Sequence, residues 1–132
     1  MDVLASRLIL RPKDPGVTRR FYRDDLGLAV AREFGPPDNP ATVFFAGSTL
    51  IEVSGRVDAP ARAGTAIWLQ VRDVRAEVAR LADRGVRIVR EPRQEFWGLI
   101  EAWTADPDGT PIVLVEVPAD HPLRRDTRSF DG

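Results

Sequence analysis

LGLAVARE at residues 26–33 returns as RGVRIVRE at residues 84–91, and this repeat decides the fold. The two glycines, Gly27 and Gly85, are 58 residues apart (85 − 27). An Asp opens a short helical pattern before each copy, at Asp14 and at Asp73. Self-similarity at a fixed spacing means that one structural unit occurs twice. Two copies of one small module must share a core, and the seam between them is a natural place for a ligand.

The composition describes an ordinary globular chain. It has 132 residues, 19 Lys and Arg against 20 Asp and Glu, and no Cys. We therefore expect a single domain with modules at about 1–58 and 62–118, followed by a loosely held tail at 119–132. The net charge of −1 argues against partners held by bulk charge, so neither nucleic acid nor membrane is expected. No apolar stretch resembles a signal peptide, so a cytoplasmic location is expected.

Apolar periodicity and turn residues predict the order βαβββ twice. In the first module, Asp14 and Pro15 open a helix that Gly27 ends. In the second, Asp73 opens the helix and Gly85 ends it. Pro92 is expected to break the strand after that helix, and residues 106–109 (DPDG) form a type I turn. The expected strands cover residues 4–11, 28–34, 41–46 and 49–54, then 66–71, 86–90, 99–105 and 111–117.

Three segments resemble the vicinal oxygen chelate superfamily, which includes glyoxalase I, extradiol dioxygenases and bleomycin-resistance proteins. They are RFYRDDLGL at 20–28, WG at 97–98 and DPDGT at 106–110. The order of elements agrees over residues 4–117. The resemblance implies an α+β fold in which two tandem βαβββ modules form a cup-shaped mixed sheet around one cavity. It also implies a homodimer.

Metal enzymes of that superfamily bind a divalent metal through four side chains on the first and last strands of each module. The resemblance places these four positions of the superfamily at Arg7, Glu52, Ala66 (or Thr65) and Val113 of this sequence. Only Glu52 is a plausible ligand, because Arg cannot bind a cation and Ala and Val carry no lone pairs. No metal site and no cofactor are therefore expected, with a divalent metal as the disfavoured alternative.

The alternation of side chains along each strand then selects the residues that face the expected cavity. Ile51 and Val53 suit packing under a helix, which turns Glu52 toward the cavity. Arg7 then either forms a bidentate ion pair with Glu52 or is a solvated strand end. Trp68 is favoured for the cavity, Trp97 for its rim, and Trp103 for the core. The ligand-binding candidates are Arg7, Ile9, Arg11, Glu52, Trp68, Gln70, Trp97, Glu101, Trp103 and Val113.

Three functions fit these residues. The first is metal-free binding of a small molecule, such as sequestration of an aromatic natural product or antibiotic. The second is a lyase or dioxygenase-type enzyme in which Glu52 acts as the catalytic base or as the sole protein ligand of a metal. The third is a dimeric module with no small ligand. Tyr22 is expected to pack rather than donate a proton, and Asp106 and Asp108 to serve a turn rather than a calcium loop.

Overall fold

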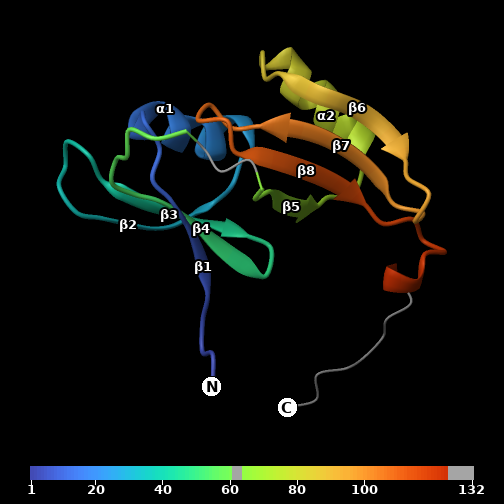
Figure 1. Cartoon of the computed structure of the whole chain (residues 1–132), viewed down its shortest axis with the longest axis horizontal. Helices are drawn as coiled ribbons and strands as arrows, with labels where there is room; N and C mark the ends of the chain where they lie inside the picture. Colours follow the sequence, from blue (N-terminus) through green and yellow to red (C-terminus); the bar gives the residue numbers. More distant parts are fainter. Residues whose placement is uncertain (61–63, 125–132) are drawn as a thin grey trace. The chain divides into compact units, whose positions relative to one another are not determined.

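The computed structural model describes residues 1–60 and 64–124, and Figure 1 shows their course. The chain divides into two compact units. Unit 1 comprises Met1–Ala66 with Ala105–Pro111, and unit 2 comprises Ile67–Thr104 with the chain from Ile112 onward. Each unit holds one four-stranded mixed sheet, so the chain is an α+β protein of two tandem modules, as predicted.

Unit 1 has the predicted order βαβββ, and its strands lie in the order β1-β4-β3-β2. Strand β1 runs parallel to β4, and the other neighbours are antiparallel. The elements are β1 (Arg7–Leu10), α1 (Pro15–Arg20), η1 (Phe21–Asp25), β2 (Val30–Phe34), β3 (Ala41–Ala46) and β4 (Thr49–Val53).

The helix of unit 1 begins as the sequence predicts but does not stay α-helical. The Asp14 carboxylate accepts the N–H of Val17 at 3.2 Å, and Pro15 occupies the first turn. From Phe21 the helix widens into a π-helical turn, in which the N–H of Leu26 reaches the carbonyl of Phe21 at 2.9 Å. Gly27 then takes a positive φ of 71°, which ends the helix.

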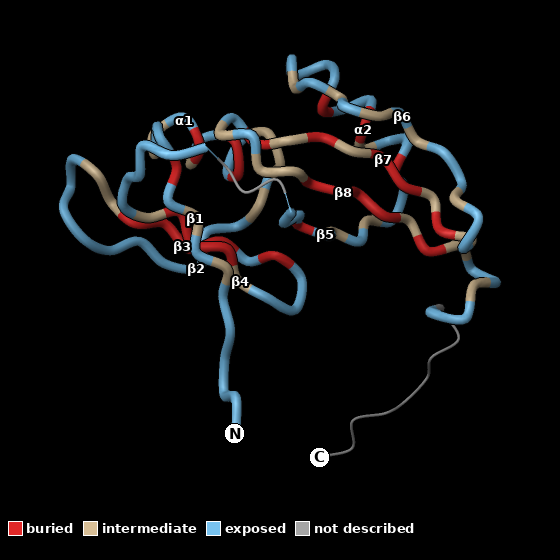
Figure 2. The backbone as a smooth tube through the Cα atoms, in the orientation of Figure 1, coloured by how far each residue is buried: buried red, intermediate tan, exposed pale blue. Residues whose placement is uncertain are grey.

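Aromatic side chains on that helical turn form the core of unit 1. Phe21 and Tyr22 are buried and meet edge to face, with ring centroids 5.2 Å apart. The Tyr22 ring lies 6.1 Å from Phe44 on β3, and Phe44 is the register partner of Ile51 on β4. Phe44 and Ile51 therefore face the helix. Figure 2 shows the buried stretches of β3 and β4 beneath it.

Unit 2 repeats the same order and the same sheet topology, β5-β8-β7-β6, which confirms the two-module prediction. Asp73 caps its helix by accepting the N–H of Ala76 at 3.0 Å, and Gly85 ends it with a φ of 81°. The elements are β5 (Ile67–Gln70), α2 (Val74–Asp83), β6 (Ile88–Gln94), β7 (Ile100–Ala105), β8 (Pro111–Glu116) and η2 (Pro122–Arg124).

Pro92 does not break its strand, and that prediction was wrong. Strand β6 continues through Pro92 to Gln94. It is an edge strand of unit 2, and its register with β7 shifts between Arg90 and Arg93. A bulge on an edge strand leaves Pro92 with no ladder hydrogen bond to donate, so the missing N–H costs nothing there.

The predicted tail begins with a turn and a short 3-10 helix. The N–H of His121 donates to the carbonyl of Pro118 at 3.0 Å, and η2 follows. The rest of the predicted tail, residues 125–132, lies outside the described part of the chain. None of the helices within residues 1–60 and 64–124 has the length and apolar character that crossing a membrane requires.

Candidate ligand-binding site

Each sheet has one face toward its helix and a second face away from it, the open face. Its central side chains, such as Val43 and Val113, are buried, whereas Ile9 and Trp68 on the edge strands are exposed. The predicted residues of β1 and β4 lie on the open face of unit 1. Glu52 alternates with Ile51 and is the register partner of Val43 on β3 and Ile9 on β1. Since Ile51 faces the helix, Glu52 and Ile9 point the other way. Arg7 lies two residues before Ile9 on β1 and therefore points to the same face. The prediction that turned Glu52 away from the helix therefore agrees with the observed register.

Arg7 and Glu52 form an ion pair across this face. Arg7 Nη1 donates to Glu52 Oε1 at 2.7 Å, and the Ser54 hydroxyl donates to Oε2, also at 2.7 Å. The predicted bidentate geometry was wrong, because Ser54 occupies the second oxygen. The hydrogen bond from Ser54, then that from Arg7, holds the pKa of Glu52 below its ordinary value. Glu52 is therefore a carboxylate with both oxygens engaged.

The side chains at the four positions carried over from the superfamily do not fit a divalent metal. Arg7 brings a positive charge, the side chains of Ala66 and Val113 offer no ligand atom, and the alternative Thr65 offers only a neutral hydroxyl. Within the described residues, no group of three or more His, Cys, Asp or Glu side chains could hold a metal ion. Glu52 is already bound to Arg7 and Ser54, so a cation would have to displace both.

The open face of unit 2 carries the predicted aromatic residues. The Trp68 side chain is 49 % exposed, and Gln70 is exposed beside it on β5. Val113, the register partner of Trp68, is buried in a cluster with Leu99, against which Trp103 packs. The core role favoured for Trp103 fits this packing. Val113 is buried together with its neighbours on β8, and its contact with a ligand stays a prediction.

Trp97 and Glu101 form a second polar contact in unit 2. The indole N–H of Trp97 donates to Glu101 Oε2 at 2.8 Å, and Glu101 is buried while Trp97 is 45 % exposed. The carbonyl of Trp97 lies 2.9 Å from Nε2 of His121. The neighbouring ring atom, Cδ2, lies over Gly98, where an added Cβ would be only 2.9 Å away. His121 at the start of the tail therefore contacts the loop at Trp97 and Gly98. The sequence did not predict this contact.

We expect Gly98→Ala to lower the free energy of unfolding by about 1.5 kcal/mol. Gly98 has a φ of 94°, a conformation that disfavours any Cβ, and the new methyl would also press on His121. Urea denaturation measures the loss. The double variant with His121→Ala should recover part of it, because it removes the contact but not the backbone strain. Full stability in the single variant would contradict this geometry.

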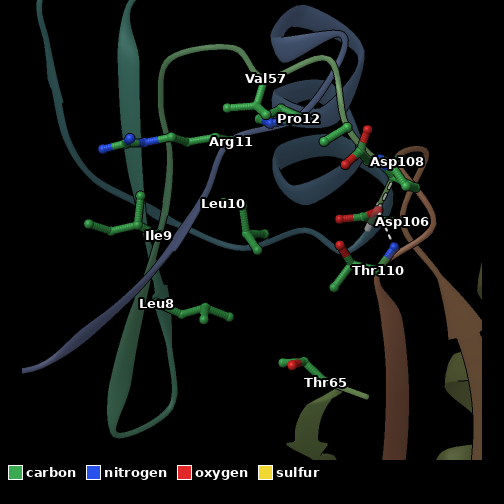
Figure 3. A pocket seen from close by; sticks show the side chains of 12 residues that line it. Leu8, Ile9, Leu10, Arg11, Pro12, Val57, Thr65, Asp106, Asp108 and Thr110 are labelled. Carbon is green, nitrogen blue, oxygen red and sulfur yellow. Dashed lines mark hydrogen bonds between the residues drawn. The ribbon is translucent and has the colours of Figure 1, made fainter. Parts of the chain in front are cut away.

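A cavity of about 430 Å³ lies beside β1 in unit 1 (Figure 3). Of the predicted ligand-binding residues, Ile9 and Arg11 line it. Thr65 was considered only as a metal position, and Asp106 and Asp108 only as turn residues. They come from β1, from the segment after β4 and from the turn between β7 and β8. The lining is Leu8, Ile9, Leu10, Arg11, Pro12, Val57, Ala59, Pro60, Thr65, Asp106, Asp108 and Thr110.

Asp106 anchors the turn that forms one wall of this cavity. Its Oδ1 accepts the backbone N–H groups of Asp108 and Thr110, each at 2.9 Å. Its Oδ2 accepts the hydroxyl of Tyr22 at 2.8 Å. Tyr22 is fully buried, and burial together with the neighbouring Asp106 raises its pKa far above the ordinary value. Tyr22 is therefore a structural donor, in agreement with the packing role expected for it.

Comparison with solved structures shows the same fold in several proteins. TnmS3, an antibiotic-binding protein from Streptomyces sp. CB03234, is 20% identical with a TM-score of 0.73, covering 89% of this chain and 98% of its own. A lactoylglutathione lyase from Agrobacterium tumefaciens is 18% identical with a TM-score of 0.64, covering 88% and 94%. A superfamily member from Sphaerobacter thermophilus is 23% identical with a TM-score of 0.65, covering 88% and 97%.

No curated protein matches the chain closely enough to count as a relative. A family model does match, over residues 5–114, which is most of the chain. The match covers both modules and confirms the resemblance drawn from RFYRDDLGL, WG and DPDGT. This chain belongs to the Glyoxalase/Bleomycin resistance protein/Dioxygenase superfamily.

Proposed function

We propose that this protein binds a small aromatic molecule without a metal ion, as a sequestering protein rather than an enzyme. The observation that carries the proposal is the Arg7–Glu52–Ser54 network. It occupies one of the superfamily's metal positions with a guanidinium and uses both oxygens of the remaining carboxylate. A site without donors for a metal keeps the fold's capacity to bind a ligand.

The exposed aromatic side chains of unit 2 support an aromatic ligand. Trp68 and Trp97 each expose close to half of their surface. Half-exposed aromatic surface beside a few polar groups is typical of small-molecule sites. Gln70 is the exposed polar group of unit 2 that we assign to the same role.

The solved neighbours of this fold include both candidate classes. TnmS3 is an antibiotic-binding protein, and the Agrobacterium protein is a lactoylglutathione lyase. Function follows the site and not the fold, so the choice between them depends on Glu52. A general base works best with a pKa near the working pH, whereas the pKa of Glu52 is lowered. This favours binding over catalysis. We also propose that the protein forms a homodimer and acts in the cytoplasm.

A titration of the protein with planar aromatic compounds, such as anthraquinones and flavonoids, tests the proposal. We expect saturable quenching of Trp fluorescence for at least one compound. Trp68→Ala should then weaken its binding by about thirtyfold, as truncation of an aromatic anchor does. Calorimetry measures the affinity of each variant, because the substitution also removes a fluorophore.

The matched control is Val89→Ala, which shortens another half-exposed apolar side chain of unit 2. It should leave the affinity unchanged. Equal weakening by both variants, or no saturable binding of any compound, would contradict the proposal. Turnover of a compound that Glu52→Gln abolishes would establish the enzyme instead.

A further inference from the structure

We propose that the cavity beside β1 is a second site, which binds a protonated amine carried on a compact apolar body. The cavity and all its lining residues belong to unit 1. The proposal rests on Leu8, Leu10, Asp106 and Asp108, none of which belongs to the aromatic site proposed above.

The size and walls of the cavity suit a small apolar body. Its volume of about 430 Å³ lies within the range of small-molecule pockets. Leu8 and Leu10 project into it from β1, and Val57 and Pro12 close its upper side in Figure 3. Strand β1 is at the edge of the sheet of unit 1, so no strand of that sheet covers this side. An apolar ligand would remove these side chains from water.

The charges that face the apolar part of the cavity are negative. Asp106 and Asp108 lie on the wall opposite Leu10, whereas Arg11 and Ile9 project from the other side of β1 (Figure 3). Within the described residues, neither carboxylate has an ion pair with a basic side chain. The cavity lining therefore holds two carboxylates against one guanidinium, that of Arg11, so its charge is negative overall.

Asp108 is the carboxylate that can accept further hydrogen bonds. Its Oδ1 accepts the backbone N–H of Lys13 at 3.0 Å, and its other oxygen has no partner among the described residues. Asp106, in contrast, accepts three hydrogen bonds that fix the turn. The hydroxyls of Thr65 and Thr110 line the same cavity as further acceptors.

An ammonium group matches these acceptors because it has three donors and a positive charge. A carboxylate or phosphate would meet two negative charges. An alcohol could donate only one hydrogen bond to a carboxylate and would bring no positive charge to offset it. The cavity thus selects by charge at one wall and by shape at the others. An amine on an aliphatic cage has the positive charge and the compact apolar shape that the cavity requires. It lacks the planar ring of the aromatic ligand proposed above.

Three probes of equal shape test the charge selection: 1-adamantylamine, 1-adamantanol and 1-adamantanecarboxylate. Methyl NMR of the whole chain reports on the Leu8, Leu10 and Val57 side chains during titration. We expect the amine to shift these signals and to bind about tenfold more tightly than the alcohol, with the carboxylate weakest. Equal affinity for amine and alcohol, or no shifts at millimolar amine, would overturn the proposal.

Asp108→Asn removes the charge and keeps a side-chain oxygen for the N–H of Lys13. It should weaken the amine about tenfold and leave the alcohol unchanged. Asp83→Asn, the same change at the end of α2 in unit 2, is the control and should change neither. Ala59→Phe, which fills the cavity from its wall, should abolish shifts from all three probes. An unchanged amine affinity in Asp108→Asn, in a variant whose NMR spectrum shows the native fold, would overturn the assignment.

Discussion

We expect Asp106→Ala to lower the free energy of unfolding by about 4 kcal/mol, the largest effect of any substitution considered. The side chain is buried, 5 % exposed, and accepts hydrogen bonds from Tyr22 and from the backbone of Asp108 and Thr110. Truncation leaves these donors without their acceptor, and the buried Tyr22 hydroxyl cannot turn to water. Urea denaturation followed by circular dichroism measures the change.

Two milder substitutions separate the parts of this network. Asp106→Asn keeps an oxygen for the two backbone groups and should cost less than half as much as Ala. Tyr22→Phe removes the buried hydroxyl and leaves the turn intact. Because the pKa of Tyr22 is raised in the folded state, its contribution is complete below pH about 10 and declines above it. Equal losses for Asn and Ala would show that the turn does not need the Asp106 oxygens.

We expect Glu52→Ala to lower the free energy of unfolding by about 2 to 3 kcal/mol at neutral pH. Arg7 then loses the partner that lies 2.7 Å from its Nη1, and Ser54 loses its acceptor. The cost is less than for a fully buried pair, because 37 % of the Arg7 side chain is exposed and can be solvated. Arg7→Met, which removes the other partner, is the matched variant.

The pH dependence of this effect has a definite sign. The folded-state pKa of Glu52 is lowered, first by Ser54 and then by Arg7. Its contribution is therefore present above the unfolded value of about 4.3 and is lost as the pH falls through the folded value. The stability gap between the native chain and Glu52→Gln should narrow on acidification below pH about 4. A gap that stays constant to low pH would contradict the ion pair.

The repeat was enough to predict most of the fold because it combines local signals that agree. Asp14 and Asp73 cap helices in the structure, and Gly27 and Gly85 end them at positive φ. Strand parity also placed Glu52 on the face away from the helix. Pro92 misled the prediction, since whether a proline is tolerated depends on the strand's place at the sheet edge, which is a tertiary fact.

The site was harder to predict because it depends on contacts between distant segments. The cavity joins β1, the segment around Val57 and the turn at Asp106, none of which signals the others in sequence. Asp106 was interpreted as a turn residue only, although the same residue binds Tyr22. His121 in the tail also contacts the carbonyl of Trp97 in the loop between β6 and β7. A single histidine in the sequence does not indicate which distant residue it contacts.

Native mass spectrometry of the gently purified protein, with no chelator present, tests the central claim most directly. We predict a folded chain without a bound divalent metal, which gains a mass equal to one aromatic compound when the compound that quenches its Trp fluorescence is added. Supplying Zn²⁺, Ni²⁺ or Mn²⁺ should add no stoichiometric metal, because Glu52 is held by Arg7 and Ser54. One metal ion per chain, lost in Glu52→Gln, would contradict the account and place this protein among the metal enzymes of its superfamily.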